Sequence, residues 1–294
     1  MKIKDSFGDR VFNGIIYVVL AVLVLIVIYP LWLVVINSFS DSNAVSLGEV
    51  TLLPVGFNLD AYIKTFTYDN VLSGYLNSLY YTVVGTLLSL LFTIPVAYTL
   101  SKRNLKGRGF MMGVFTLVMY FSGGLIPEYI NIRSLGLVNT REVVLLVGAL
   151  SVYNMIVARS FFESGVPHEL EEAAEIDGCN QLQTFIRIVL PLSKAMLGVI
   201  TLYYAVAKWN SFTPSLYYQP MAPQFHSLQM VLRDLIIRAQ NSVTMQGEDA
   251  VYYAELLNKI KYSVIVVASV PMLVIFPFVQ KYFDKGVMLG SVKG

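Results

Sequence analysis

The sequence predicts an all-α membrane protein with six transmembrane helices, both termini in the cytoplasm and a helical loop between the fourth and fifth spans. Three observations predict this fold class. Of the 294 residues, 56% are hydrophobic and 14% are charged, whereas a soluble domain has about 25% charged residues. Uncharged runs of nearly bilayer-spanning length recur along the chain. Most charged residues lie in the segments between these runs.

Six uncharged runs are the candidate spans. Four of them have, or nearly have, the length of about 20 residues that a transmembrane helix needs. Two shorter runs, Val143–Ala158 and Ala195–Ala207, qualify if basic residues at their ends extend toward the interface; short runs could also be interfacial or re-entrant. The spans are expected at residues 15–36, 76–100, 110–127, 142–160, 191–209 and 262–281 of a single transmembrane domain over residues 1–294.

The first run differs from a signal peptide. Ile15–Ile36 contains more uncharged residues than the apolar region of a signal peptide, and no small-residue cleavage site follows it. Basic residues then indicate the orientation of the spans. The short loop Ser101–Gly109 has four basic residues and no acidic residue. Because basic loops stay in the cytoplasm, this loop predicts that both termini and residues 161–190 are cytoplasmic.

The loop over residues 161–190 contains the signals of a short helix. Pro167 suits a helix start, because its missing N–H would be unpaired there. Acidic residues follow in the first turns, where the helix dipole favours them. Gly178 can take the positive φ that ends a helix. We therefore expect a helix from about Pro167 to Asp177, then a turn, then a second helix over Gln181–Ile188.

The spacing of residues in this loop carries a resemblance. Glu172-Ala173-Ala174 is followed by Asp177-Gly178 and then by Ile188-x-Leu190-Pro191. This pattern resembles the EAA loop of binding-protein-dependent ABC importer permeases. Cys179 stands where the family usually has Ala, and Ala195 where a second Pro is common. The resemblance implies a coupling helix that docks on an ATPase, with these coupling residues: Glu171, Glu172, Ala173, Ala174, Asp177, Gly178, Ile188, Leu190 and Pro191.

The resemblance covers most of the chain and extends to the carbohydrate branch of the family. Asn77-Ser78, the basic turn after the second span and Gly123-Gly124-Leu125-Ile126-Pro127 are similar to LplC/YtcP-type subunits. The glycine-punctuated tail, residues 284–294, resembles the C-terminus of the second permease subunit of maltose-type importers. The resemblance therefore implies that Gly290, Lys293 and Gly294 reach the interface between two ATPases.

The family resemblance also implies partners and a location. It implies a multi-pass permease of the bacterial inner (plasma) membrane that translocates a carbohydrate, with an oligosaccharide preferred over a monosaccharide. The expected partners are a second homologous permease subunit, two ATPase subunits, an extracytoplasmic solute-binding protein, the carbohydrate and membrane lipid. ATP and Mg would bind to the ATPases, and no cofactor to this chain. The net charge of +2 does not suggest nucleic acid as a partner.

Motifs for catalysis are missing from the sequence. It has no G-x-x-x-x-G-K-[ST] phosphate loop, so the energy must come from another subunit. His168 and His226 are the only histidines and do not form a zinc-protease motif. The single cysteine, Cys179, cannot form an internal disulfide. The uncharged runs contain no ionisable residue, which argues against an ion-coupled transporter. We therefore expect that the chain alone is not an enzyme and has no catalytic or metal site.

Polar and aromatic residues near the span ends are candidates for a substrate pathway. Sugars have hydroxyl groups and apolar faces that stack on aromatic rings. The candidates are Tyr120, Tyr153, Asn154, Trp209 and Asn210. Tyrosines near span ends could instead anchor the helices at the membrane interface. Two other functions stay open: an ABC permease for a non-sugar solute, and a membrane scaffold that recruits a cytosolic partner without transport.

Overall fold

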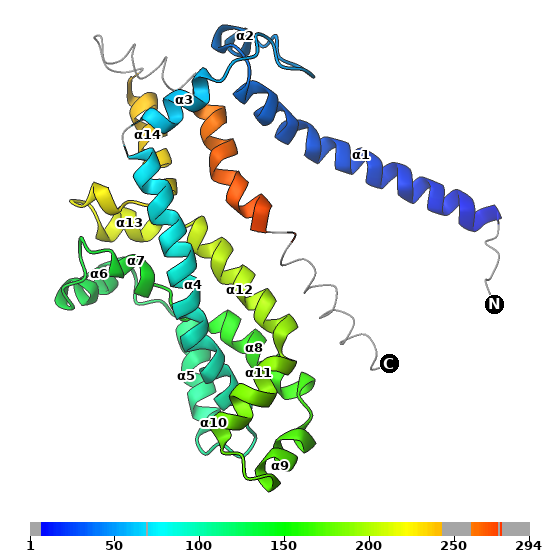
Figure 1. The fold of residues 1–294 in the computed structure, drawn as a ribbon, viewed down its shortest axis with the longest axis vertical. Helices are drawn as coiled ribbons and strands as arrows, with labels where there is room; N and C mark the ends of the chain where they lie inside the picture. Colours follow the sequence, from blue (N-terminus) through cyan, green and yellow to red (C-terminus); the bar gives the residue numbers. More distant parts are fainter. Residues whose placement is uncertain (1–6, 69, 243–259, 276, 278–294) are drawn as a thin grey trace. The chain divides into compact units, whose positions relative to one another are not determined.

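The structure is a computed structural model that describes residues 7–68, 70–242, 260–275 and 277 (Figure 1). Within these ranges every regular element is a helix, as the sequence predicts. The chain divides into two compact units. Unit 1 comprises Met1–Tyr68 and Leu235–Ser269, and unit 2 comprises Asp69–Asp234 and Val270–Gly294.

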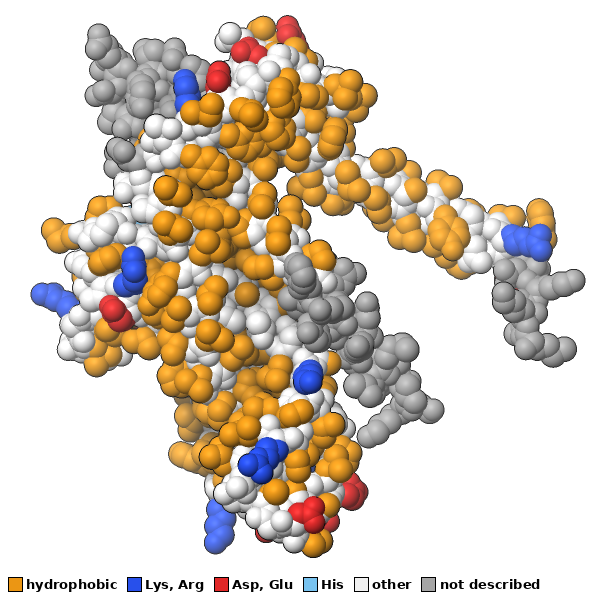
Figure 2. Space-filling view, in the orientation of Figure 1, with side chains coloured by type: hydrophobic (Ala, Val, Ile, Leu, Met, Phe, Trp, Pro, Cys, Tyr) orange, Lys and Arg blue, Asp and Glu red, His pale blue; other side chains and the backbone are white. Residues whose placement is uncertain are grey.

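Unit 1 contains the first predicted span and two short helices. Helix α1 covers Phe7–Ser38, with Pro30 inside it, and only 6% of its most apolar window is buried. Figure 2 shows hydrophobic side chains along the whole length of α1. The short helices are α2 over Ser42–Ser46 and α3 over Asp60–Thr67. A further apolar helix, Ile260–Ile275, is joined to α3 by a hydrogen bond of 2.6 Å between the Ser263 and Thr65 hydroxyls.

Unit 2 is built around one long helix. Helix α4, Val71–Ser101, corresponds to the second predicted span and has Pro95 in its interior. It packs against α8, Val152–Gly165, and α12, Lys194–Trp209. Small residues on the buried face of α4, such as Ser78, Gly85 and Ser89, allow this close packing of apolar helices. The core between the three helices includes Ile94, Ala97, Met155, Ala158 and Ile200.

The third and fourth predicted spans are not continuous helices in the structure. The first of them is α5, Arg108–Tyr120, followed by α6, Leu125–Ser134, at an angle of 114°. The other is α7, Glu142–Leu146, a non-helical stretch over residues 147–151, and then α8. Gly148 lies in that stretch with φ +68°, a conformation that L side chains rarely adopt. The break between α7 and α8 is not visible in the uncharged run Val143–Ala158, because glycine carries no charge.

The segment leading into the fifth predicted span is also bent. Helix α10 covers Gln181–Thr184, a π-helix η1 covers Phe185–Val189, and α11 covers Leu190–Leu192. The α10–α11 segment meets α12 at 83°. Ser193 is buried at the bend, and its Oγ donates to the Val189 carbonyl at 2.8 Å. Helix α12 itself begins at Lys194, three residues after the expected start of the fifth span.

The chain after α12 folds back onto the first turns of α4. Helix α13 covers Thr213–Tyr218, the 3-10 helix η2 covers Pro223–Phe225, and α14 covers Leu228–Ser242. The Asn77 amide donates to the Gln224 and His226 carbonyls at 2.8 and 3.1 Å. The Ser78 hydroxyl accepts a hydrogen bond from the Leu228 N–H at 2.8 Å. The Asn77-Ser78 pair thus anchors this returning segment.

Two of the described helices, α1 and α4, are long and apolar enough to cross a membrane. The number rises to four if each bent pair, α5 with α6 and the α10–α11 segment with α12, is one span. Helix α8 has 14 residues, and Ile260–Ile275 is also below the usual length. The described residues therefore support the all-α membrane class but give two to four candidate spans instead of six. The end of the sixth predicted span, residues 278–281, lies outside the described residues.

Candidate functional site

The predicted loop helix is present as α9, His168–Ile176, with Pro167 at its N-cap. The helix ends as the sequence predicts, at Gly178 with φ +82°. The N–H of Gly178 donates to the Glu175 carbonyl at 3.0 Å, and the N–H of Cys179 donates to the Ala174 carbonyl at 2.9 Å. These two bonds form a Schellman motif, which pairs carbonyls that a helix end would leave unsatisfied. The spacing of Ala174, Gly178 and Cys179 therefore has a direct structural reason.

A second cap fixes the start of α10. The Asn180 side chain accepts from the Gln183 N–H at 2.9 Å, and the Gln183 side chain accepts from the Asn180 N–H at 3.0 Å. This reciprocal pair is a capping box. The turn between α9 and α10 is thus held from both sides. Of the remaining predicted coupling residues, Ile188 lies in η1, whereas Leu190 and Pro191 lie in α11.

Helix α9 has one buried and one exposed side. Ala174 is buried within this chain, whereas Ala173 is exposed. Glu172 and Asp177 are exposed as well. Ile176 of the same helix is 87% exposed. Figure 2 shows charged side chains gathered at the end of unit 2 that carries α9.

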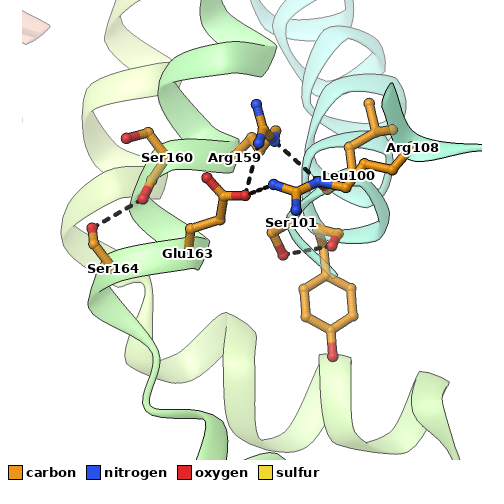
Figure 3. Close-up of polar contacts among 8 residues, drawn as sticks. Leu100, Ser101, Arg108, Arg159, Ser160, Glu163 and Ser164 are labelled. Atoms are coloured by element: carbon orange, nitrogen blue, oxygen red, sulfur yellow. Dashed lines mark hydrogen bonds and ion pairs between the residues drawn. The ribbon is translucent and has the colours of Figure 1, made fainter. Parts of the chain in front are cut away.

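Glu171 differs from the neighbouring Glu172, because its side chain is only 16% exposed. It forms an ion pair with Lys102, which directly follows α4. A second ionic group lies on the same end of α4 (Figure 3). There, Glu163 of α8 pairs with Arg108 and with Arg159.

The two arginines of this group also contact the backbone of α4. The Nε atoms of Arg108 and Arg159 both donate to the Leu100 carbonyl, at 2.9 and 3.0 Å (Figure 3). The last carbonyls of a helix have no partner within the helix and carry its negative dipole end, so two guanidinium groups stabilise this end. The predicted tail residues Gly290, Lys293 and Gly294 lie outside the described residues.

A cavity of about 910 Å³ lies in unit 2 between α6, α8, α12 and α13. Two of the candidate pathway residues, Tyr153 and Asn154, line it. Tyr120, Trp209 and Asn210 are not among its lining residues. Trp209 is 1% exposed and packs edge-to-face on Tyr75 with ring centroids 5.7 Å apart, so it is part of the packed core.

Two charged residues of this cavity were missed by the sequence analysis. Lys208 of α12 lines the cavity and is 8% exposed. Its Nζ donates to the carbonyls of Val144, Leu145 and Val147 at 3.0, 3.1 and 3.0 Å. The break after α7 frees these carbonyls, and a freed carbonyl away from water must find another donor. The sequence contains one signal for this role: Lys208 directly follows the uncharged run Ala195–Ala207, so its charge lies at the end of a predicted span.

Glu128 of α6 is the second of these residues and lies near Tyr218. Burial and a hydrogen bond to Glu128 raise the pKa of Tyr218 to about 12, so this hydroxyl stays protonated at neutral pH. With Tyr153, Tyr203 and Tyr217, the cavity has several tyrosine rings and few charges. Such a surface suits a ligand that has both apolar faces and hydroxyl groups.

The chain is similar to known transport proteins over nearly its whole length, although no family model matches it. It is 37% identical over 286 residues to the polygalacturonan/rhamnogalacturonan transport system permease protein YtcP of Bacillus subtilis strain 168, covering 97% of this chain and 99% of YtcP. It is 39% identical over 269 residues to protein LplC of the same organism, covering 92% of this chain and 90% of LplC. A crystal structure of a bacterial ABC transporter involved in the import of the acidic polysaccharide alginate matches with a TM-score of 0.85 and 32% identity. That match covers 96% of this chain and 100% of the other.

Proposed function

The chain belongs to the family of sugar ABC transporter permeases, and from this premise we propose that it is a membrane-spanning subunit of a binding-protein-dependent importer. The importer translocates an oligosaccharide and is driven by ATP hydrolysis on two separate ATPase subunits. Its other partners are a second, homologous permease subunit and an extracytoplasmic solute-binding protein. ATP and Mg bind to the ATPases, and this chain binds neither.

The observation that carries the proposal is the full-length similarity to YtcP together with helix α9 at the position of the family's coupling helix. The coupling residues are Glu171, Glu172, Ala173, Ala174, Asp177, Gly178, Ile188, Leu190 and Pro191. A capped, acidic helix with Ile176 exposed on it suits a docking element for a soluble protein. The tail residues Gly290, Lys293 and Gly294 are proposed to contact the same ATPases.

The proposed topology has six spans in the bacterial inner (plasma) membrane, with both termini and α9 on the cytoplasmic side. The bent pairs α5–α6 and α10–α12 would each count as one span. The fourth span would consist of α7, the stretch around Gly148 and α8. A non-helical stretch is compatible with a membrane where it lines a cavity and its carbonyls are paired, which is the arrangement that Lys208 supports.

We also propose that the cavity beside Tyr153 and Asn154 is this subunit's part of the sugar pathway. Tyr153→Leu would remove an aromatic face and a hydroxyl, and we expect uptake to fall about tenfold, the effect of losing one good contact. ATP hydrolysis stimulated by the binding protein should continue. Tyr17→Leu, an exposed position on α1, is the matched control. Equal uptake by both variants would contradict the role of Tyr153.

The test of the proposed function begins with purification of the tagged chain from its own cells in mild detergent. We expect one ATPase and one homologous membrane subunit to co-purify, and the complex to import a short glycan into proteoliposomes when ATP is supplied. Trigalacturonate and a neutral arabino-oligosaccharide are suitable first probes, because the names of relatives point to both kinds. Co-purification with no ATPase would instead favour a membrane scaffold. Import of a non-sugar solute would favour the other alternative.

A further inference from the structure

We propose that Tyr98, Lys102 and Glu171 fasten the coupling helix α9 to the end of α4, so that a displacement of α9 is transmitted to this span. This inference rests on the proposed function, because it assumes that an ATPase displaces α9. It assigns to Glu171 a positioning role within the subunit, in contrast to the ATPase contact that the family pattern implies.

The contacts of Glu171 connect segments that are distant in the sequence. One carboxylate oxygen forms an ion pair with Lys102 Nζ. The other accepts a hydrogen bond from the Tyr98 hydroxyl at 3.2 Å. Both partners belong to the end of α4 or the residue after it. With 16% of its side chain exposed, Glu171 is too enclosed to serve as the main contact for another protein.

The Tyr98 ring contacts two further segments at the same point. It stacks on Phe185 of η1 at a centroid distance of 4.7 Å. It packs edge-to-face on Phe162 of α8 at 5.6 Å. Lys102 Nζ lies 4.1 Å from the ring centroid, within the range of a cation–π interaction. The buried Tyr98 side chain therefore contacts three helices of the chain: α9 through Glu171, η1 through Phe185 and α8 through Phe162.

These contacts divide the acidic residues of α9 by role. The Glu171 carboxylate is used inside the subunit, whereas Glu172, the next residue, is exposed. Ala174 is buried on the inner side of the same helix. A displacement is transmitted only through contacts that cost free energy to separate, and charge-assisted hydrogen bonds and stacked rings are the strongest available here. The inner side of α9 thus carries the mechanical link.

The test uses charge reversal in the complete complex with its co-purified partners. Lys102→Glu and Glu171→Lys each place like charges together, and the double variant restores the pair in swapped order. Lys106→Glu is the control, because it reverses the same charge in the same loop at an exposed position outside the link. Tyr98→Phe, which keeps the ring and loses only the hydroxyl, is a milder second variant if the single reversals fold poorly.

The measurement is the distance between nitroxide labels at Ile176 of α9 and Leu87 of α4, both exposed positions, in a Cys179→Ser background. In the otherwise unmodified chain we expect one distance, which stays unchanged when ATP and vanadate trap the ATPases. In either single reversal, a second distance should increase in population about tenfold, the effect of losing one charge-assisted contact. The double reversal should return the single distance, and Lys106→Glu should not differ from the unmodified chain.

Two results would overturn the inference: single reversals that keep one distance, or an unmodified chain whose distance already changes on trapping. A single reversal that the swapped pair does not rescue would also count against it. Failure of the proposed function looks different, because then no ATPase co-purifies with the chain. If an ATPase co-purifies and hydrolyses ATP while the distances are unaffected, only the role of Tyr98, Lys102 and Glu171 is wrong.

Discussion

The two ends of unit 2 pair the free carbonyls of helix ends in different ways. At the cavity, one buried cation, Lys208, pairs with three backbone carbonyls of the broken segment after α7. At the other end, partly exposed charges lie beside the last turn of α4. This α4 end cluster consists of Arg108, Arg159 and Glu163; it does not include Glu171, whose contacts hold α9. The first arrangement depends on one side chain, and the second is shared among three.

This difference indicates which end is rigid and which can rearrange. Removing a buried donor leaves its acceptors unpaired, which costs more than the pair itself contributes. A half-exposed ion pair contributes little, because water and salt compete for both charges. The cavity wall should therefore keep one shape, whereas the α4 end cluster can exchange partners at small cost.

The largest expected effect comes from Lys208→Met. Methionine keeps the apolar length of the side chain but donates no hydrogen bond, so three carbonyls lose their partner. We expect the free energy of unfolding to fall by about 3 kcal/mol and the midpoint of thermal unfolding in detergent by about 6 °C. Lys194→Met, an exposed position at the start of the same helix, is the control. If both variants melt alike, the cavity wall does not depend on Lys208.

An intermediate effect on stability is expected for a substitution of Gly178, which follows α9. Its φ of +82° is strongly disfavoured for a β-branched residue, so Gly178→Val should destabilise the Schellman motif by about 2 kcal/mol. Co-purification of the ATPase should decrease accordingly. Gly178→Asn is the matched variant, since Asn tolerates this conformation, and it should retain most of the ATPase. Equal losses from both substitutions would show that backbone conformation is not the cause.

The smallest effect is expected for Glu163→Gln in the α4 end cluster. The change leaves Arg108 and Arg159 facing one another without their shared carboxylate, and we expect a loss of about 1 kcal/mol or less. Since these charges are partly exposed, the difference from the unmodified chain should shrink in 1 M salt. Thermal unfolding at low and high salt measures this. A loss as large as that of Lys208→Met would remove the distinction between the two ends.

The coupling loop was the part of the structure that the sequence predicted best. Its helix depends on local signals, namely Pro167 before it, acids in its first turn and Gly178 after it. These signals act within a few residues, so they are readable without knowledge of the fold. At the start of helix α14, Leu228–Ser242, the Leu228 N–H donates to the distant Ser78 hydroxyl, and no local pattern in the sequence reveals this contact.

The breaks in the third and fourth spans were not predictable from hydropathy. Gly124 and Gly148 carry no charge, so they do not interrupt an uncharged run. Both nevertheless take a positive φ in the structure. The role of Lys208 was hidden for a related reason. Its position at the end of a run suggested a side chain that reaches toward the interface, and only the tertiary structure brings it against the carbonyls of Val144, Leu145 and Val147.

The central claim, that α9 lies in the cytoplasm against an ATPase, has one most direct test. A cysteine that replaces Ile176, which is 87% exposed, is introduced into a Cys179→Ser background in intact cells, labelled with a membrane-permeant benzophenone maleimide and irradiated. We predict a cross-linked product that contains the ATPase subunit, and protection of this cysteine from a membrane-impermeant thiol reagent added outside. Labelling from outside, with no cross-link to an ATPase, would contradict the account.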